Sequence, residues 1–260
     1  MARICPLFSS SKGNCTLIGS SDNYIFIDAG VSARMLSTAL AERGVSVSDI
    51  AAIFVTHEHE DHIKGIKLFA GKNSIPVYAT AGTLREMKRK GVLDGVDSRV
   101  MPESIEISGM TVRCFSTSHD TAQSCGYVVT LPDGRKAAVA TDMGYVSETV
   151  RAALRGCDAM VIESNHDEMM LRSGPYPPLL KQRILSPSGH LSNDACAAEL
   201  AELVRRGSTR FFLGHLSEEN NTPALALSCA EKALCAAGFK NGYDYILCAA
   251  APRDNEMVVF

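Results

Sequence analysis

The chain has 260 residues, of which 46% are hydrophobic and 21% are charged, and its formal net charge is −3. This composition is typical of a globular protein with no overall attraction to nucleic acid or to an anionic membrane. The N-terminus lacks the apolar core of a signal peptide, and no run approaches the ~20 apolar residues of a membrane span. We therefore expect one domain over residues 1–260, located in the cytoplasm and without a membrane partner. Any polyanionic ligand must be held by local charges.

The first half of the chain alternates short apolar runs with turn residues and then with helical patterns. The opening runs are separated by turns at residues 9–14 and 19–23, which is typical of a meander. Later strands alternate with helices and form βα units. The elements that we expect are strands over residues 4–8, 15–18, 24–27, 52–55 and 76–79, and helices over residues 31–43, over residues 80–90 and from Ile63 onward.

The second half of the chain has the same alternation of strand and helix patterns, which implies a second sheet. The expected strands cover residues 104–107, 110–116, 126–130, 136–140, 159–163 and 210–213, with residues 245–248 and 257–260 as candidates to close the sheet. Helices are expected over residues 147–154, 193–206 and 223–237. Helices that flank two packed sheets make a four-layer α/β fold, the αββα sandwich.

A cluster of potential metal ligands, Thr-His-Glu-His-Glu-Asp-His, directly follows the buried strand at residues 52–55. His57 and His59 are two positions apart, so both rings can face one point, while Asp61 and His62 lie one turn further on and can face a second point. Three of the seven histidines fall in this segment. A metal site is therefore favoured over a polar surface loop, and the spacing suits two metals better than one.

Four further polar residues occur at the ends of predicted strands or in the following loops, where functional sites are built: His119, Asp142, His190 and His215. The order HxHxDH, His, Asp, His resembles the metallo-β-lactamase superfamily over essentially the whole chain. This resemblance implies two divalent ions per chain, zinc or manganese, because sites of mixed histidine and carboxylate ligands take either metal. It also implies that the first ion is held by His57, His59 and His119, the second by Asp61, His62 and His215, and that Asp142 bridges them.

Shorter motifs narrow the resemblance to the YycJ type of metallo-β-lactamase-fold exonuclease, a relative of RNase Z and RNase J. They are Ser-Lys-Gly-Asn-Cys from Ser11, Glu-Ser-Asn-His-Asp from Glu163, Gly-His-Leu-Ser-Asn from Gly189 and His-Leu-Ser-Glu-Glu-Asn-Asn from His215. In RNase Z-like enzymes a histidine of a Gly-His segment assists proton transfer, with an upstream glutamate behind it. By resemblance His190 and Glu163 take these catalytic roles, and Asp61 accepts a hydrogen bond from the nucleophile.

Several residues of these motifs are candidates for substrate contacts. Ser192 can cap the helix that begins at Asn193, which places His190 just before a positive helix end where a phosphate oxygen can bind. The basic run at residues 85–90 is a candidate contact for a nucleic-acid backbone, although such a run is usually a solvated helix face. For His166 a structural role is an equal alternative. The substrate-binding candidates are Asn14, His166, Ser192 and Asn220.

Three functions are compatible with these patterns. The resemblance implies a metal-dependent phosphodiesterase that acts as a 5′ to 3′ DNA exonuclease, with DNA favoured over RNA as partner. The second is a small-molecule hydrolase on the same fold, acting on a thioester, a lactone or a cyclic phosphodiester. The third is a non-catalytic binding module, which the complete ligand set disfavours. Oligomeric state is left open by the sequence.

Overall fold

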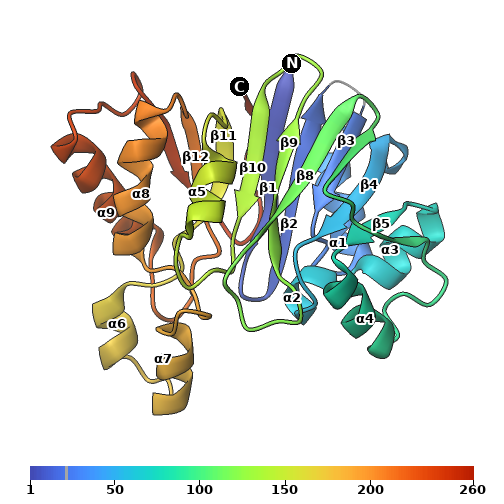
Figure 1. The fold of residues 1–260 in the computed structure, drawn as a ribbon, viewed down its shortest axis with the longest axis horizontal. Coiled ribbons are helices and arrows are strands. Elements are labelled where there is room, and N and C mark those ends of the chain that lie inside the picture. The colour runs from blue at the N-terminus through green and yellow to red at the C-terminus, as the bar shows by residue number, and fades with distance from the viewer. Residues whose placement is uncertain (21–22) are drawn as a thin grey trace.

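Two sheets pack face to face, and helices cover their outer faces, in a computed structural model that describes residues 1–20 and 23–260 (Figure 1). Each sheet has seven strands. The αββα sandwich predicted from the sequence is confirmed. The turn expected at residues 19–23 includes Ser21 and Asp22, which lie outside the described residues.

The first sheet, in the order β14-β1-β2-β3-β4-β5-β6, begins as an antiparallel meander and continues as parallel strands from β3 to β6. The final strand β14 pairs with β1 and so joins this sheet. Its strands are β1 (Ala2–Ser10), β2 (Gly13–Ser20), β3 (Asn23–Ile27), β4 (Ile50–Val55), β5 (Val77–Ala79), β6 (Ser98–Val100) and β14 (Val258–Val259).

The second sheet, in the order β13-β12-β11-β10-β9-β8-β7, has an antiparallel half from β7 to β10 and a parallel half from β10 to β13. Parallel strands end at the same edge, so the loops after them are brought together. Its strands are β7 (Ser104–Ile107), β8 (Met110–Ser116), β9 (Cys125–Thr130), β10 (Lys136–Ala140), β11 (Ala159–Glu163), β12 (Arg210–Gly214) and β13 (Ile246–Ala249).

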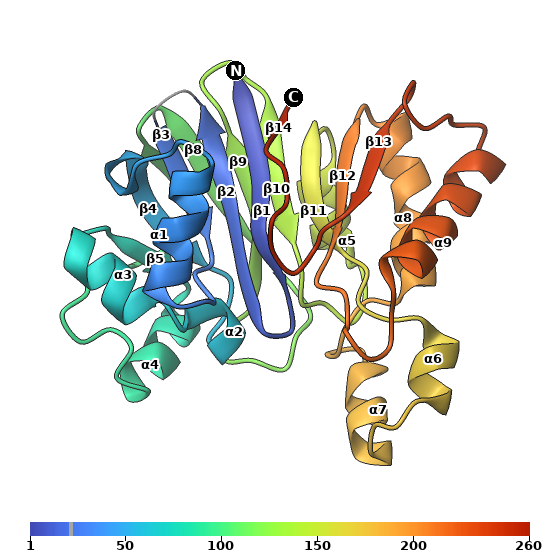
Figure 2. The same cartoon turned by 180° about the vertical axis from the view of Figure 1, so that it is seen from behind.

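Helices α1, α3 and α4 cover the first sheet, whereas α5, α8 and α9 cover the second (Figures 1 and 2). The short pair α6 and α7 projects from the lower end of the molecule in both views. Within the described part of the chain, none of the helices is long and apolar enough to cross a bilayer. The helices are α1 (Ala33–Glu42), the 3₁₀ turn η1 (Val47–Asp49), α2 (Glu60–Ile63), α3 (Ile66–Asn73), α4 (Ala81–Arg89), α5 (Glu148–Leu154), α6 (Glu168–Ser173), α7 (Pro178–Ile184), α8 (Asn193–Arg205) and α9 (Pro223–Ala236).

The structure differs from the expected elements in several places. Residues 257–260 were a candidate strand of the second sheet, but β14 pairs with β1 in the first sheet. The helix expected from Ile63 onward is divided into α2 and α3 at Gly65, whose N–H donates to the carbonyl of Ala29 (2.8 Å). A Cβ at Gly65 would lie only 2.4 Å from the carbonyl oxygen of Val31. The strand β6 and the helices α6 and α7 were not expected. The three positions of β6 are exposed, α6 buries Leu171 alone and α7 buries Ile184 alone, so none of them has an apolar face that the sequence could show.

The helix cap predicted at Ser192 is present in the structure, and Thr222 forms a second cap of the same kind. The hydroxyl of Ser192 accepts a hydrogen bond from the backbone N–H of Ala195 (3.2 Å) at the start of α8. Thr222 likewise accepts one from Leu225 (3.2 Å) at the start of α9. Such caps satisfy backbone donors that have no partner inside the helix. They fix the entry of α8 and α9, and thereby the loops that precede these helices.

A fully buried aromatic cluster fills the space between the sheets, and its removal tests how far this core stabilises the fold. The Phe54 ring packs on Tyr78 at 5.2 Å and on Tyr127 at 5.6 Å between ring centroids. Phe54→Ala should lower the free energy of unfolding by about 3 to 5 kcal/mol, as measured by urea denaturation. Met169→Ala is the matched control, because this side chain is 79% exposed. Equal midpoints for the two variants would contradict this account of the core.

Candidate active site

The predicted ligands come from loops that follow strands of both sheets. Strand β4 delivers the histidine motif, and the loops after β8, β10 and β12 carry His119, Asp142 and His215. The structure brings all of these side chains to one edge of the sandwich. They form groups whose potential ligand atoms all lie within 4.8 Å of one another. Residues separated in sequence are therefore close enough to share metal ions.

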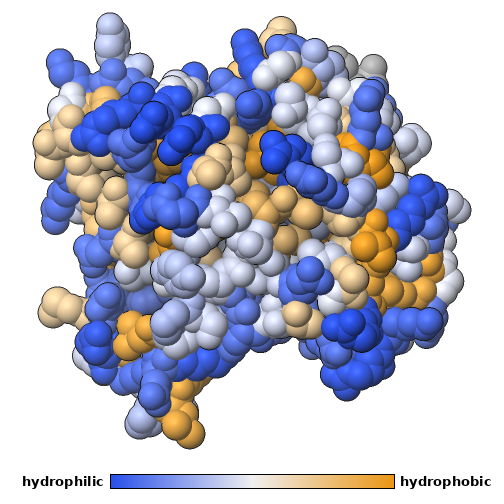
Figure 3. Space-filling view, viewed as in Figure 1, coloured by the Kyte–Doolittle hydropathy of each residue, from blue (hydrophilic) through white to orange (hydrophobic). Residues whose placement is uncertain are grey.

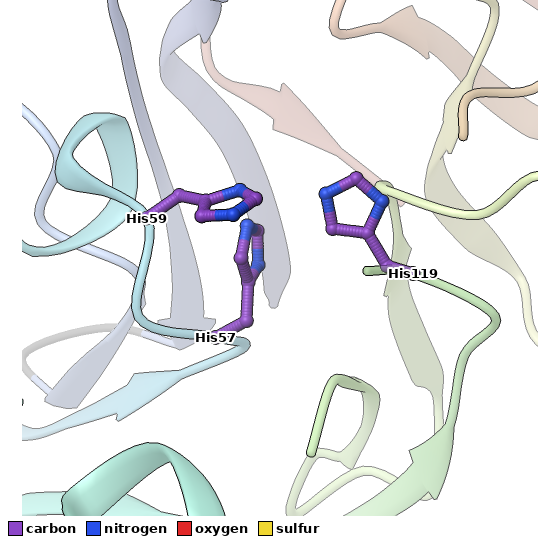
Figure 4. A group of neighbouring side chains, drawn as sticks. All are labelled: His57, His59 and His119. Carbon is purple, nitrogen blue, oxygen red and sulfur yellow. The ribbon is translucent and has the colours of Figure 1, made fainter. Parts of the chain in front are cut away.

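The first group consists of His57, His59 and His119. Figure 4 shows the three rings turned toward one another, His57 and His59 from the loop after β4 and His119 from the opposite side. The ring centroids are 4.6 Å apart for His57 and His59 and 5.0 Å apart for His57 and His119. Three convergent imidazoles offer the nitrogen ligands that zinc and manganese accept.

The second group consists of Asp61, His62 and His215. Asp61 Oδ2 lies 3.3 Å from His62 Nε2 and 3.6 Å from His215 Nε2. Asp61 and His62 come from the short helix α2 of the first half, whereas His215 follows β12 of the second half. This group therefore joins the two sheets at their common edge.

The buried carboxylate of Asp142 lies between the two groups. Its Oδ2 is 3.4 Å from His62 Nε2, and its Oδ1 is 3.7 Å from His119 Nε2 and 3.6 Å from His215 Nδ1. Asp142 has a φ of 58°, a left-handed conformation that aspartate tolerates better than most residues. One carboxylate thus faces both ligand groups, as a bridging ligand must.

The carboxylate of Asp28 controls the ring nitrogens of two ligand candidates. His62 Nδ1 donates directly to Asp28 Oδ2 (2.8 Å). The Thr56 hydroxyl donates to the same oxygen (2.9 Å), so it accepts from His57 Nδ1 (3.0 Å). Both rings therefore carry a proton on Nδ1, so that Nε2 is the atom turned to the ligand groups. His57 Nε2 has no partner among the described residues, whereas His62 Nε2 lies 3.2 Å from Asn14 Nδ2. Ligand histidines in metalloproteins are commonly oriented in this way.

Two partners in the second half of the chain orient His119 and His215. His119 Nδ1 donates to the carbonyl of Gly189 (3.0 Å), and His215 Nδ1 donates to Glu163 Oε1 (3.0 Å). These contacts again occupy Nδ1 and turn Nε2 of each ring to the ligand groups, where it has no partner among the described residues. His215 also has a positive φ of 56°. A strained backbone at a ligand position is held by its surroundings and is frequent at functional sites.

Several buried polar atoms of this cluster have no hydrogen-bond partner among the described residues. Each buried polar atom without a partner costs about 1 to 3 kcal/mol of folding free energy. Four such atoms in one cluster therefore require an explanation. Divalent cations, one at each group, would accept the lone pairs of these atoms. These residues therefore fit a metal centre. The atoms are His57 Nε2, His119 Nε2, His215 Nε2 and Asp142 Oδ2.

Burial and neighbouring charges set the protonation of the cluster. Burial lowers the pKa of His57 well below its usual value, which keeps this ring neutral as a metal ligand must be. Burial opposes ionisation of Asp142, but the surrounding histidines, His215 first, lower the pKa of its carboxyl well below the usual range. Burial also disfavours a charge on His62, yet the nearby carboxylates, Asp28 first, raise its pKa. A metal ion would replace a proton on that ring.

His190 and Glu163 form a pair beside the ligand groups. His190 Nδ1 donates to Glu163 Oε1 at 2.8 Å, and 14% of the His190 side chain is exposed, whereas Glu163 is fully buried. Burial opposes the charge on Glu163, but His190 and then His215 lower the pKa of its carboxyl to about 2. Glu163 Oε2 also accepts from the backbone N–H of Met143 (2.8 Å). A single carboxylate thus holds His190, His215 and the Asp142 loop.

The residues expected to contact substrate have different surroundings. The amide nitrogen of Asn14 already has partners within the chain: Nδ2 donates to the carbonyl of Ser10 (2.9 Å) and to Asp61 Oδ2 (3.1 Å). Asn14 therefore holds a ligand candidate in place. The hydroxyl of Ser192 caps α8. His166 and Asn220 are buried, and His166 Nε2 and Asn220 Oδ1 have no hydrogen-bond partner among the described residues.

Two residues that bind to the ligands or to the loops that carry them were not among the site residues predicted from the sequence. Asp28 ends strand β3 in the segment Asp-Ala-Gly, and its φ of 64° is a property that sequence does not show. Glu58 lies inside the histidine motif but is turned away, and its Oε1 accepts from the backbone N–H of Ala122 (2.8 Å) near His119. The sequence contained a signal for each residue. Asp28 directly follows a buried strand, and Glu58 is the charged residue between His57 and His59.

Replacement of Asp28 by asparagine should weaken metal binding without unfolding the protein. Asparagine tolerates a positive φ, but its NH₂ facing His62 Nδ1 would move the ring proton to Nε2, the atom that must bind the ion. Loss of such a partner typically costs 10 to 100-fold in metal affinity. Competition with a chelator measures this affinity. Asp133→Asn, in an exposed turn, is the control, and equal affinities in the two variants would refute the tautomer argument.

The family model described as the beta-lactamase superfamily domain matches residues 23–216. The chain is 35% identical to the exodeoxyribonuclease YycJ of Bacillus anthracis over 91% of this chain and 90% of that protein. It is 34% identical to the exodeoxyribonuclease WalJ of Streptococcus pneumoniae, over 95% and 93% of the two chains. Among solved structures, the metallo-β-lactamase fold protein YhfI from Bacillus subtilis superposes with a TM-score of 0.74 at 15% identity, covering 99% of each chain. The chain belongs to the metallo-β-lactamase superfamily and is homologous to the exodeoxyribonucleases YycJ and WalJ.

Proposed function

We propose that this protein is a metal-dependent phosphodiesterase that degrades DNA from the 5′ end. The observation that carries the proposal is the His190–Glu163 pair (2.8 Å). The pair forms a further potential ligand group with Asp142 and His215, but the groups of His57, His59 and His119 and of Asp61, His62 and His215 each have three side chains without His190. A ring held in this way is suited to proton transfer. The names of the two relatives, which span nearly the whole chain, support DNA as the substrate.

In the proposed site the seven ligand candidates divide into two sets around Asp142. Two divalent ions, zinc or manganese, would supply Lewis acidity that polarises a phosphodiester and makes water more acidic. We assign one ion to the first group and one to the second, with the Asp142 carboxylate facing both. The ligands are His57, His59 and His119 for the first ion and Asp61, His62 and His215 for the second.

The chain's own residues would orient the reactants and move protons. Asp61 keeps its charge, because His62 and His215 lower the pKa of its carboxyl despite burial, and it can accept a hydrogen bond from the attacking water. His190 holds its Nδ1 proton toward Glu163, so its Nε2 can donate a proton to the leaving oxygen when the ring is charged. Glu163 stabilises that charged ring and fixes its orientation.

Digestion of end-labelled DNA tests the proposal. The metal-loaded protein is incubated with single- and double-stranded DNA labelled at the 5′ or at the 3′ end, with RNA of the same sequence, and with a thioester and a lactone. Release of labelled mononucleotide at once from 5′-labelled DNA, and only late from 3′-labelled DNA, is expected for attack from the 5′ end. Hydrolysis of the thioester or lactone with every nucleic acid left intact would assign the site to small-molecule substrates and defeat the proposal.

A further inference from the structure

We propose that the groove between α2, α3 and the loop after α4 binds the phosphate backbone of the DNA strand at the active site, which rests on the function proposed above. The groove has a volume of about 480 Å³ and is open at the surface. Its lining contains three lysines and a single acid. The lining residues are Glu60, Ile63, Lys64, Lys67, Lys90, Gly91 and Val92.

The position of the groove links it to the metal ligands. Its first wall is the helix α2, which carries Asp61 and His62 toward the ligand groups and Glu60 and Ile63 toward the groove. Lys64 follows His62 by two residues, so the Cα atoms are about 5.5 Å apart while the two side chains point to different sides of the chain: His62 is buried among the ligands, and the exposed Lys64 lines the groove. A strand whose scissile phosphate lies at the ligands could therefore place a neighbouring phosphate against Lys64.

The charge of this region opposes that of the rest of the chain. Residues 60–90 contain seven lysines and arginines against three acids, although the whole chain has a net charge of −3. Lys64, Arg85 and Lys88 are exposed and have no ion pair among the described residues, whereas Lys67 is paired with Asp94 (3.0 Å). Figure 3 shows a strongly hydrophilic surface over α4, at the lower right of the molecule. Unpaired cations beside the site are complementary to a polyanion.

The groove is tied to the histidine motif by direct contacts. Lys90 Nζ donates to the carbonyl of Glu58 (2.7 Å), which lies between His57 and His59. The side chain of Glu58 in turn accepts from the backbone N–H of Ala122, in the loop of His119. A DNA phosphate backbone bound along α4 would therefore lie at a fixed distance from the first ligand group. An unrelated solvated surface would have no such connection.

The opposite rim of the site, formed by α6 and α7, lacks comparable free cations. Arg183 is paired with Asp120, with 2.8 Å between Nη2 and Oδ1, and Arg172 is paired with Glu168 (3.2 Å). Lys181 donates to a backbone carbonyl (2.7 Å). The large exposed side chains of this rim, Met169 and Leu179, are apolar. The phosphate backbone is therefore assigned to the α4 side.

The experiment compares a groove variant with a variant of equal charge on the opposite layer. Lys64→Gln/Lys88→Gln, the groove variant, removes two unpaired charges, one in the groove lining and one beside it on α4, whereas Lys67 and Lys90 are kept because they hold Asp94 and the Glu58 carbonyl. Lys232→Gln/Lys240→Gln removes two exposed charges on and after α9. For each metal-loaded protein, kcat/KM on a 20-nucleotide DNA is measured over a range of salt concentrations. Turnover of bis(p-nitrophenyl) phosphate, which is too small to reach the groove, is measured in parallel.

The groove variant should lose on the order of tenfold in kcat/KM on DNA at physiological salt, and the magnitude of its log–log salt slope should fall by about 1.4 to 1.8. Its turnover of the small diester, and both activities of the control, should equal the wild type. A wild-type slope in the groove variant, or an equal loss in the control, would overturn the groove assignment while DNA cleavage stands. A wild-type protein that cleaves neither DNA nor the small diester would overturn the proposed function itself.

Discussion

His190→Ala is expected to lower turnover on DNA by on the order of 10² to 10⁴-fold while leaving the metal content and the fold unchanged. The reason is that each ligand group already supplies three side chains, and Asp142 faces both groups. His190 is instead bound to Glu163 and partly exposed to the site. Its loss should therefore remove a proton donor and not a metal ligand.

Elemental analysis, thermal unfolding and turnover of the His190→Ala protein decide between these roles. Glu163→Gln provides the companion measurement, because it keeps the shape but weakens the charged partner of His190. This variant should move the basic limb of the pH profile to lower pH as well as lower turnover, because the charged form of a proton-donating ring loses its carboxylate partner. Loss of one ion in the His190→Ala protein would make His190 a ligand, and unchanged turnover would remove it from the reaction.

Asp142→Ala is expected to lose most of the metal from both groups and to reduce nuclease turnover to background. The Asp142 carboxylate lies within 3.7 Å of His62 and His119, which belong to different groups. Removal of a ligand shared by two ions should weaken both, since three histidine or carboxylate ligands would remain for each. Metal content per chain, measured after dialysis, reports the loss directly.

The backbone of Asp142 requires a second variant. Alanine is strained at a φ of 58°, so the loss in Asp142→Ala could arise from a displaced loop. Asp142→Asn keeps a residue that tolerates this conformation and removes only the charge, and it should also lose metal from both groups. His59→Ala is the comparison, and it should deplete mainly the first group. Two ions per chain in the Asp142→Asn protein would rule out the bridging role.

Much of the fold could be predicted because its signals are local. The apolar runs, the cap at Ser192 and the spacing of His57, His59 and His62 are all properties of short segments. Close packing around Gly65, which divides α2 from α3, depends on contacts with Ala29 and Val31 from a distant segment. Such contacts leave no periodic trace in the sequence.

The candidate site shows the same division. The candidate ligands and their order can be recognised in the sequence. The residues that hydrogen-bond to these ligands can be identified only from the three-dimensional structure. Asp28 reaches His62 only because its backbone adopts a positive φ, and Asn14 meets Asp61 only because strands β1 and β2 form a hairpin beside α2. A motif names the side chains that face an ion, but the tertiary fold decides which side chains orient them.

The division of the ligands between the two sheets has a consequence for the protein as it is being synthesised. A nascent chain that has just left the ribosome exposes His57, His59, Asp61 and His62 long before His215 exists. At roughly 5 to 20 residues per second, the interval is on the order of 10 s. During that time the histidine-rich loop of the growing chain is exposed to the metal ions of the cell before the rest of the ligands have been made. The first group can assemble once His119 has been made, but the second group and its contact with Asp142 can form only after His215, when the second sheet packs against the first.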